Sequence, residues 1–363
     1  MEHLSRPMKI KKMYIRQATP EDNEELQALQ ARCLYGTDLV VSTVNTPDFF
    51  ARAKAYESYR VFVACEDDQI IGSGACALRG ALVSGEMVPV GYVFQVFTSP
   101  DRRRRGVARE LIRHIEEHLT REGAVLSYAL IFEDNLPPMR LVEGHGYRLH
   151  RSLVMPMLLV YQPMDLPPRG QVRPAASEDL DDAARLLNET WQGFELYEPA
   201  SADGLAGFIR RTPAYDLDDL LVLEHRGEIV ACLGVWDWSR ITRITVKALT
   251  AKLRVMGWLL NLARLFRPMS RLPGPGETLS QWCLTPIGFR EVEDLAVLLR
   301  YVNNQALSSG AGQVFCVCEK DHPLLEGTKG FFRTDVLVHL YVKALQRGVL
   351  LGDGAVFVDG IDL

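Results

Sequence analysis

The sequence predicts a mixed α/β fold made of two similar halves. Short apolar segments with the composition of strands alternate with amphipathic segments of helical period, the pattern of a sheet covered by helices. The order of these segments begins again after residue 170, which indicates a duplicated domain. The length of 363 residues agrees with two domains, since a domain has roughly 150 residues.

Composition and charge narrow the classes of function. Hydrophobic residues make up 47% of the chain and charged residues 24%, which is ordinary for a globular protein in water. The net charge of −5 argues against a nucleic-acid binder, because such proteins are usually basic. The seven cysteines are an odd number in no metal-type spacing, so we expect free thiols in a reducing cytoplasm and no metal site. Residues 1–12 lack the apolar core of a signal peptide and are predicted to be a flexible tail.

Residues 13–163 are predicted to form the first domain. Thr19 can cap a helix that has Pro20 at its first position, and the polar residues 66–69 between two apolar runs indicate a hairpin. The predicted elements are a strand at Met13–Arg16, a helix at Glu21–Arg32, strands at Val61–Cys65, Ile70–Leu78 and Tyr92–Thr98, a helix at Gly106–Glu122, a strand at Val125–Phe132, a helix at Asn135–Glu143 and a strand at Ser152–Leu159.

Two stretches of the first domain are less regular. Thr37–Tyr59 is polar and is expected to be irregular, with a helix around Asp48–Glu57. Such a region can shape a substrate cleft or can be a plain connecting helix, and both interpretations stay open. Ala81–Val88 is expected to continue the sheet more loosely.

The segment Gly91–Glu110 carries the clearest functional pattern. It predicts a strand, a sharp turn and the start of a helix, and the turn holds four consecutive arginines, residues 102–105. Peptide N–H groups at a helix N-terminus and arginine side chains both favour negative charge, so this segment predicts a pyrophosphate site. ATP or NAD is a weak candidate for the ligand, because neither GxxxxGK[ST] nor GxGxxG follows a strand.

Residues 164–170 are rich in proline and glycine and are predicted to link the first domain to a second, residues 171–363. Four segments of the second half match segments of the first. The matched pairs are Val172–Asp179 with Ile15–Asp22, Leu221–Val235 with the hairpin at Val61–Ala75, Ser280–Pro286 with Phe94–Pro100, and Gly310–Asp321 with Gly123–Asp134.

The second half lacks the arginine turn. After Pro286 the sequence again predicts a helix start, but Glu291, Glu293 and Asp294 stand where the first half has arginines. Carboxylates repel a pyrophosphate, so the second domain is expected not to bind the same ligand.

One insert in the second half, residues 245–271, is predicted to be a basic amphipathic helix. Such a helix can lie on a membrane or on a protein partner. The interpretation we favour from sequence is a helix packed over the domain junction, with its basic side chains reaching water. The insert is too short and too charged to span a bilayer, so no integral membrane association is expected.

Two motifs give the first half a family resemblance. Arg103-x-x-Gly106-x-Ala108 after a strand resembles the acetyl-CoA motif of the GNAT acyltransferases, and Asn135 to Tyr147 resembles a second motif of that superfamily in identical spacing. Gly91-Tyr92-Val93 and Ser127-Tyr128-Ala129 are similar to segments of the Hookless-type acetyltransferases. The resemblance implies two GNAT-like domains in tandem, with the second degenerate.

The resemblance also implies a co-substrate, acetyl-CoA, and a set of residues that would bind it. The pyrophosphate would lie on the N–H groups of Arg104–Arg109, and the end of the central strand would offer a backbone N–H to the thioester carbonyl. The implied binding residues are Val96, Phe97, Thr98, Arg103, Arg104, Arg105, Gly106, Val107, Ala108, Arg109 and Asn135. The acceptor would be an amine of a small molecule or peptide, and the protein a monomer or homodimer.

The catalytic groups depart from the family pattern. The usual tyrosine acid falls at Val142, which cannot transfer a proton. The candidate replacements are Tyr92, Glu86, Tyr128 and the terminal carboxylate of Leu363. The sequence therefore supports an acetyl-CoA-dependent N-acetyltransferase, and the alternative is a CoA-binding sensor or scaffold without turnover.

Overall fold

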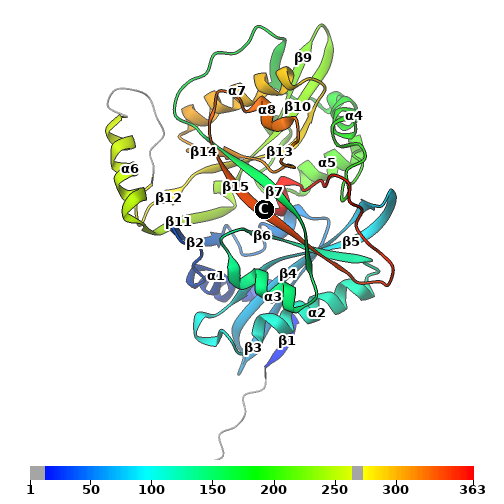
Figure 1. Cartoon of the computed structure of the whole chain (residues 1–363), viewed down its shortest axis with the longest axis vertical. Coiled ribbons are helices and arrows are strands. Elements are labelled where there is room, and N and C mark those ends of the chain that lie inside the picture. The colour runs from blue at the N-terminus through cyan, green and yellow to red at the C-terminus, as the bar shows by residue number, and fades with distance from the viewer. Residues whose placement is uncertain (1–12, 264–272) are drawn as a thin grey trace, which may run out of the picture.

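The computed structural model of the chain describes residues 13–263 and 273–363. The predicted tail at residues 1–12 and the last part of the predicted insert, residues 264–271, lie outside the described residues. Helices and strands alternate as expected, and the fold is mixed α/β, as Figure 1 shows.

Twelve of the strands in the described residues form one sheet that runs through both halves of the molecule (Figure 1). In their order across the sheet, the strands are β1 (Tyr14–Gln17), β3 (Ser58–Glu66), β4 (Gln69–Val83), β5 (Glu86–Thr98), β6 (Leu126–Phe132), β15 (Phe332–Ala344), β7 (Arg148–Leu159), β14 (Gln313–Phe315), β13 (Gln281–Phe289), β10 (Glu228–Asp237), β9 (Leu220–His225) and β8 (Gln171–Pro174).

The two halves exchange strands at the middle of this sheet. β15, near the end of the chain, pairs antiparallel with β6 of the first half, with Val338 opposite Phe132. β7, the last strand of the first half, pairs antiparallel with β14 of the second, with Leu159 opposite Gln313. β15 and β7 then pair with each other. The two halves therefore share one continuous sheet, although residues 164–170 between them hold no helix or strand.

Helices cover both faces of the sheet. They are α1 (Asn23–Arg32), α2 (Val107–Arg121), α3 (Leu136–Gly144), α4 (Leu180–Trp191), α5 (Ala202–Arg211), α6 (Ala251–Ala263), α7 (Val292–Ser309) and the short α8 (Leu324–Gly327). Val93 of β5 packs with α2, whereas its neighbour Tyr92 packs in the core that contains α1. Because successive residues of a strand point to opposite faces, α1 and α2 lie on opposite faces of the sheet.

The duplication is visible in matched ion pairs. A nitrogen of Arg16 lies 2.6 Å from an Asp22 oxygen, and Arg173 repeats this contact with Asp179 at 2.6 Å. In both halves the same carboxylate also accepts a backbone N–H three residues before it. The match of Val172–Asp179 with Ile15–Asp22 therefore corresponds to the same local structure, and β9 and β10 pair as an antiparallel hairpin, as β3 and β4 do.

The strand pairings correct one predicted match. Val90 lies opposite Leu126 at the start of the β5–β6 pairing, and Gln281 lies opposite Gln313 at the start of the β13–β14 pairing. The segment equivalent to β5 is therefore the whole of β13, and Ser280–Pro286 does not correspond to Phe94–Pro100. A short apolar run can be aligned in several registers, and only the neighbouring strand selects one.

Two further expectations about regularity were wrong. The stretch 37–59 contains a strand, β2 (Leu39–Asn45), and only a single 3₁₀ turn at Ala53–Ala55 instead of a longer helix. β4 runs on to Val83 and β5 begins at Glu86, so 81–88 is a tight hairpin and not a loose continuation.

β2 belongs to a second, three-stranded sheet that joins the halves. Its neighbour in this sheet is β11 (Thr242–Leu249), which in turn pairs with β12 (Thr278–Leu279), and both of these strands come from the second half. Thr242 lies opposite Asn45 and Leu249 opposite Leu39. The predicted insert is therefore a strand followed by a helix, α6. None of the helices in the described residues is long and apolar enough to cross a membrane.

Candidate functional site

β5 and β6 separate in the middle of the sheet. They pair in parallel from Val90 opposite Leu126 to Tyr92 opposite Tyr128, and the pairing ends there. Just beyond this point Gln95 has a φ of 50°, and the β4–β5 register shifts between Ser73 and Ala75. Such a bulge bends the strand away from its neighbour. The result is an opening between two adjacent strands, which leaves peptide groups of β5 free of β6.

Polar atoms at the opening have no partner among the described residues. Gln95 is only 8% exposed, yet neither its amide nitrogen nor its amide oxygen makes a hydrogen bond there, and the Thr98 hydroxyl is likewise unpaired. Buried polar groups usually have partners, because an unsatisfied one costs about 1–3 kcal/mol. These atoms fit a ligand that carries amide groups into the opening.

The arginine turn follows β5 directly and leads into α2. Arg102 forms ion pairs with Glu66 at 2.9 Å and with Asp101 at 2.7 Å, whereas residues 103–105 are exposed. Gly106, with a φ of 82°, precedes the helix, and a Cβ added there would meet no atom within 4 Å. The N–H groups of the first helical turn have no acceptor inside the helix. The turn can therefore hold an anion at an open, positively charged helix end.

The packing of α2 fixes the position of this turn. Val107 is buried at the start of the helix, and Leu111, Ile115 and Leu119 pack on the sheet. A Cβ on Gly91 of β5 would lie 2.4 Å from a Leu119 methyl carbon, so this close approach requires glycine. The anion site and the strand opening are therefore held on one rigid unit of β5 and α2.

The second motif borders the same opening on the side of β6. Asn135 follows β6 and precedes α3; it is half-buried, and its backbone N–H donates to the Phe132 carbonyl at 2.9 Å. Val142 on α3 is buried in an apolar cluster with Ile112 and Met139. Position 142 therefore supplies no polar group to the opening, as expected for a valine.

The second half has no comparable anion site among its described residues. α7 is the equivalent of α2, and the Asp294 carboxylate in its first turn is buried and ion-paired with Arg169 of the linking segment. Glu291 and Glu293 add further negative charge at this helix end. That the second half does not bind the same ligand stays a prediction.

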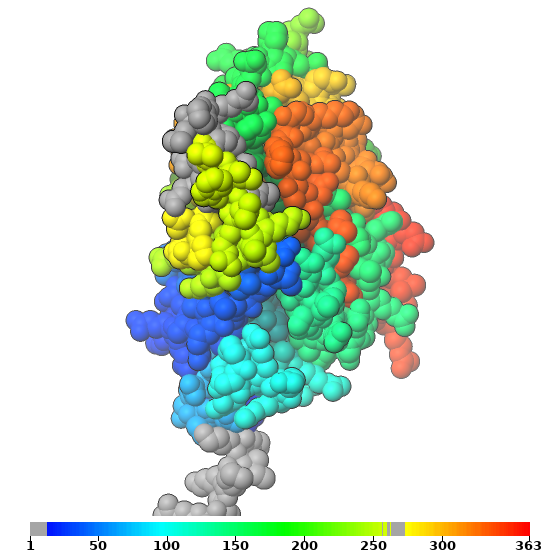
Figure 2. Space-filling model, turned by 60° about the vertical axis from the view of Figure 1, so that its left-hand side comes forward, coloured from blue at the N-terminus to red at the C-terminus, as the bar shows by residue number. Residues whose placement is uncertain are grey.

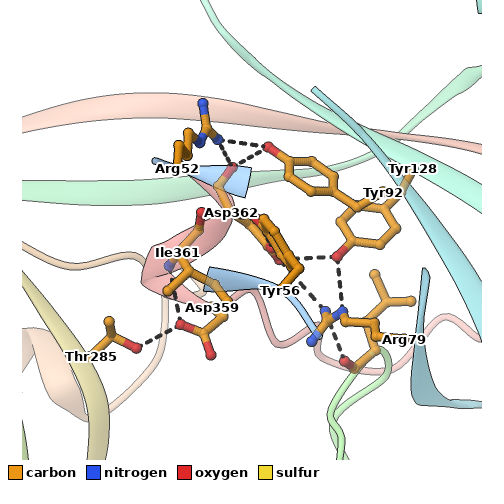
Figure 3. Close-up of polar contacts among 10 residues, drawn as sticks. Arg52, Tyr56, Arg79, Tyr92, Tyr128, Thr285, Asp359, Ile361 and Asp362 are labelled. Atoms are coloured by element: carbon orange, nitrogen blue, oxygen red, sulfur yellow. Dashed lines mark hydrogen bonds and ion pairs between the residues drawn. The ribbon is translucent and has the colours of Figure 1, made fainter. Parts of the chain in front are cut away.

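The end of the chain enters the first half beside Tyr92 (Figure 3). The Asp362 side chain is 1% exposed and accepts hydrogen bonds from the Tyr56 hydroxyl at 2.8 Å and the Tyr128 hydroxyl at 3.0 Å. Its backbone carbonyl accepts from the Tyr92 hydroxyl and, at 3.0 Å, from the Arg52 guanidinium. The last turn of the chain is thus fixed by donors from the first half.

Arg79 on β4 supplies the opposite charge. Its guanidinium lies 3.6 Å from the Asp362 carboxylate and donates to the Tyr128 hydroxyl at 3.0 Å. Burial raises the pKa of Asp362, and the charge of Arg79 opposes this shift. Burial also raises the pKa of Tyr92 and of Tyr128, so both phenols keep their protons at neutral pH. The cluster can hold and donate protons, and it is shielded from water.

The structure brings together three of the four predicted catalytic candidates. The rings of Tyr92 and Tyr128 stack with centroids 4.9 Å apart, and Leu363 follows Asp362 directly. Glu86 lies elsewhere: it is exposed at the β4–β5 hairpin, opposite Val83.

Sequence reasoning missed the other members of this cluster, Arg52, Tyr56, Arg79 and Asp362. The one available signal was Arg79, a charged residue inside an otherwise apolar strand. The Arg52 guanidinium lies 5.2 Å from the centre of the Phe94 ring, and its Nε has no acceptor among the described residues. Arg52 therefore keeps a free donor beside the residue that precedes the bulge.

A cavity of about 510 Å³ lies between the two halves, next to this cluster. Its charged lining residues are Glu57 and Arg79 from the first half, Glu198 and Arg211 from the second, and Asp359 from the end of the chain. Asp359 also accepts a hydrogen bond from the Thr285 hydroxyl at 2.6 Å. The volume suits a small organic molecule, and the lining offers charges of both signs. In the described parts of the chain, no group of three or more His, Cys, Asp or Glu side chains is placed to hold a metal ion.

Comparison with known families supports this description of the first half. Residues 14–133 match the family model described as an acetyltransferase (GNAT) domain, and they contain both the strand opening and the arginine turn. This part of the chain is therefore similar to GNAT acetyltransferase domains. A search of curated protein sequences found no match.

Solved structures with a similar fold align with nearly the whole chain. The N-myristoyltransferase of Saccharomyces cerevisiae with bound myristoyl-CoA is 12% identical, has a TM-score of 0.65, and aligns over 94% of this chain and 85% of its own. A GCN5-related N-acetyltransferase from Sphaerobacter thermophilus is 14% identical with a TM-score of 0.55, over 93% and 98% of the two chains. One from Anabaena variabilis is 14% identical with a TM-score of 0.51, over 92% and 73%. At these identities the likeness concerns the fold.

Proposed function

We propose that this protein is an N-acyltransferase that moves an acetyl group from acetyl-CoA to an amine of a small molecule or peptide. The observation that carries the proposal is the opening between β5 and β6, followed directly by an exposed arginine turn at a helix N-terminus. The arginine turn suits the pyrophosphate of a CoA thioester. The opening, with the unpaired polar atoms of Gln95 and Thr98, suits its amide-containing arm. The family match of residues 14–133 supports the same class of reaction.

The proposed binding residues follow the elements of the site. The pyrophosphate would contact the N–H groups and side chains of the turn, residues 103–109, and the chain of amides would follow β5 with Asn135 beside it. The backbone of Val96–Thr98 would donate an N–H to the thioester carbonyl as negative charge develops on its oxygen. Gln95 and Thr98 would gain partners for their unpaired polar atoms.

Proton transfer is assigned to the cluster at the end of the chain. In the direct reaction, the amine nitrogen bonds to the carbonyl carbon, the carbon–sulfur bond breaks, one proton leaves the amine and one reaches the thiolate. Tyr92 and Tyr128 are the proposed proton donors, because burial keeps both phenols protonated. The Leu363 carboxylate is the proposed base. Glu86, exposed at the hairpin, becomes the weakest of the four candidates.

The cavity between the halves is the proposed acceptor site. Tyr56 and Ile361 line it, and both belong to or contact the Asp362 cluster. Glu57, Glu198 and Asp359 supply carboxylates that suit a cationic amine. The second half would then shape the acceptor site without binding CoA.

A second candidate function is a CoA-binding sensor or scaffold. Two observations favour it: Val142 is apolar and buried where the family carries its tyrosine acid, and the hydroxyls of Tyr92 and Tyr128 are already bonded to Asp362. In this case acetyl-CoA would bind without turnover.

Two measurements on the full chain separate these functions. Calorimetric titration with acetyl-CoA and with CoA tests binding, and thiol release from acetyl-CoA across a panel of polyamines, amino acids and peptide N-termini tests turnover. Binding with amine-dependent thiol release supports the transferase, and binding without release under any amine assigns the sensor. Absence of acetyl-CoA binding would overturn both functions.

Three wider expectations stay with the proposal. All seven cysteines are free and buried, which suits a reducing compartment such as the cytoplasm. A monomer or homodimer without a nucleic-acid partner remains the expected state. The tandem arrangement, with a degenerate second GNAT-like domain and a likeness to Hookless-type acetyltransferases, stays a prediction.

A further inference from the structure

One face of α6 presents apolar side chains to water. Val255, Trp258, Leu259 and Leu262 are 61%, 64%, 53% and 44% exposed. Figure 2 shows α6, in yellow-green, standing on the surface above the blue segment that contains β2. The sequence interpretation expected this helix to pack over the domain junction. That expectation was wrong for these four side chains, which are exposed.

The exposed residues form a single stripe with basic borders. At about 100° of rotation per residue, the four apolar side chains fall within about 100° of the helix circumference. Lys252 and Arg254, both exposed, lie at the two borders of this stripe. Gly257, on the opposite side of the helix, is buried. One side of α6 is therefore packed in the protein, and the other is an apolar stripe between two cations.

The surrounding chain strengthens the positive charge. The sequence from Thr242 to Gly276 contains seven arginines and lysines and no aspartate or glutamate, although the whole chain has a net charge of −5. No equivalent exists in the first half, where β4 and β5 are joined by the short turn at Ser84 and Gly85. The basic helix is thus an addition to the duplicated fold.

This combination selects one kind of partner. Exposed tryptophan and aliphatic residues between basic side chains match the boundary of a lipid bilayer, where apolar area is buried and anionic headgroups attract cations. A second copy of the chain would bring two sets of like charges together, which opposes self-association through this face. A single convex helix also fits a flat, deformable surface without a matching groove.

We propose that α6 docks the protein on anionic lipid membranes. Val255, Trp258, Leu259 and Leu262 enter the headgroup region, and Lys252 and Arg254 contact lipid phosphates. The association is peripheral, since no helix of the described residues is long and apolar enough to cross a bilayer. It is independent of the proposed acyl transfer.

The test uses the full chain and vesicles of phosphatidylcholine with and without phosphatidylglycerol. Co-sedimentation should require phosphatidylglycerol and should weaken as salt rises. In a Trp282→Phe background Trp258 also reports directly, because Trp282 is the other partly exposed tryptophan and Trp191, Trp236 and Trp238 are only 3%, 0% and 7% exposed. Its emission should shift to shorter wavelength on binding and should be quenched by brominated lipid.

Paired variants separate the apolar and charged contributions. Trp258→Ser with Leu259→Ser should lower vesicle affinity at least about tenfold, and Lys252→Glu with Arg254→Glu should do the same. The matched controls are Leu350→Ser, at a residue 77% exposed, and Arg347→Glu, which is also exposed; both should leave affinity within about twofold.

Three outcomes would overturn the proposal. One is the absence of binding to anionic vesicles, and another is equal loss of binding in the control variants. The third is a concentration-dependent dimer, seen by light scattering, that the α6 variants abolish while vesicles have no effect. That result would assign the stripe to a second copy of the chain.

Discussion

The carboxylate of Asp362, next to the last residue of the chain, lies 3.6 Å from the guanidinium of Arg79 in the middle of β4. The Asp362 carboxylate is fully buried, the Arg79 side chain is 14% exposed, and the Tyr128 hydroxyl contacts both groups. This pair ties the end of the second half into the sheet of the first. It therefore links the stability of the whole chain to the site where the proposed reaction takes place.

Loss of this carboxylate should destabilise the fold strongly. Asp362→Asn leaves the Arg79 charge buried without its partner, which should lower the free energy of unfolding by about 3 kcal/mol in urea titrations. Arg79→Met combined with Asp362→Asn should recover part of that loss, because no buried charge then remains. Asp353→Asn, on an exposed residue of the same terminal segment, is the control and should change stability by less than about 0.5 kcal/mol. Equal effects at 353 and 362 would contradict the assignment.

Acetyl-CoA affinity should depend on Gly106 and not on Gly123. Gly106→Glu places negative charge at the proposed pyrophosphate site and should weaken binding at least about a hundredfold by calorimetry. Gly123 follows the other end of α2, has a φ of 88°, and has open space around it, as Gly106 does. Gly123→Glu therefore carries the same backbone strain and the same charge, and should keep affinity within about threefold. Similar losses in both variants would remove the turn from the binding site.

Turnover should separate the predicted catalytic candidates. Tyr92→Phe and Tyr128→Phe remove hydroxyls of the Asp362 cluster and should each lower kcat about tenfold or more, with KM for acetyl-CoA unchanged. Glu86→Gln lies outside the cluster and should keep kcat within about twofold. Circular dichroism and thermal melting would establish that the variants remain folded. Full activity in both phenylalanine variants would exclude the cluster from proton transfer.

Acid should destabilise the second half through His322. Burial against Trp191 lowers the pKa of His322 to about 4, and its Nδ1 accepts the Leu324 N–H at 3.1 Å. The unfolded chain, with a histidine pKa near 6.5, then binds more protons than the folded chain between pH 6.5 and 4. Stability is fully present above pH 6.5 and should fall by up to about 3 kcal/mol as the pH drops towards 4.

The variant His322→Asn isolates this effect. Its side-chain oxygen can still accept the Leu324 N–H, but it does not titrate. Its stability, measured by urea titration at a series of pH values, should therefore fall less steeply over the same range, even if it is lower throughout. An unchanged slope would assign the acid sensitivity to other groups.

The local parts of the site could be predicted from the sequence. The strand, arginine turn and helix of residues 91–122 are consecutive, so their spacing alone predicts an anion site. The internal repeat could also be predicted, because the segments around Arg16 and Arg173 have the same sequence pattern. In the structure both segments form the same ion pair. Composition and period are sufficient for such features.

The long-range parts could not be predicted. Tyr128 and Asp362 are 234 residues apart, and nothing in either segment indicates the other. β15 has the pattern of any buried strand, and a strand's sequence does not specify which neighbour it joins. β2 was missed because its partner, β11, comes from the insert of the other half. The exposed stripe on α6 was misjudged because helical period shows which residues share a face, not whether that face is covered.

The exchanged strands also affect the order of events during synthesis. A ribosome releases the first half long before residues 332–344 emerge, so the edge of β6 that pairs with β15 stays open during the synthesis of about 200 further residues. β7 can meanwhile pair with β14, which emerges shortly before β15, the other neighbour of β7. The nascent chain must therefore keep an open strand edge from misassociating, and the sheet of the first half is completed only after residues 332–344 leave the exit tunnel.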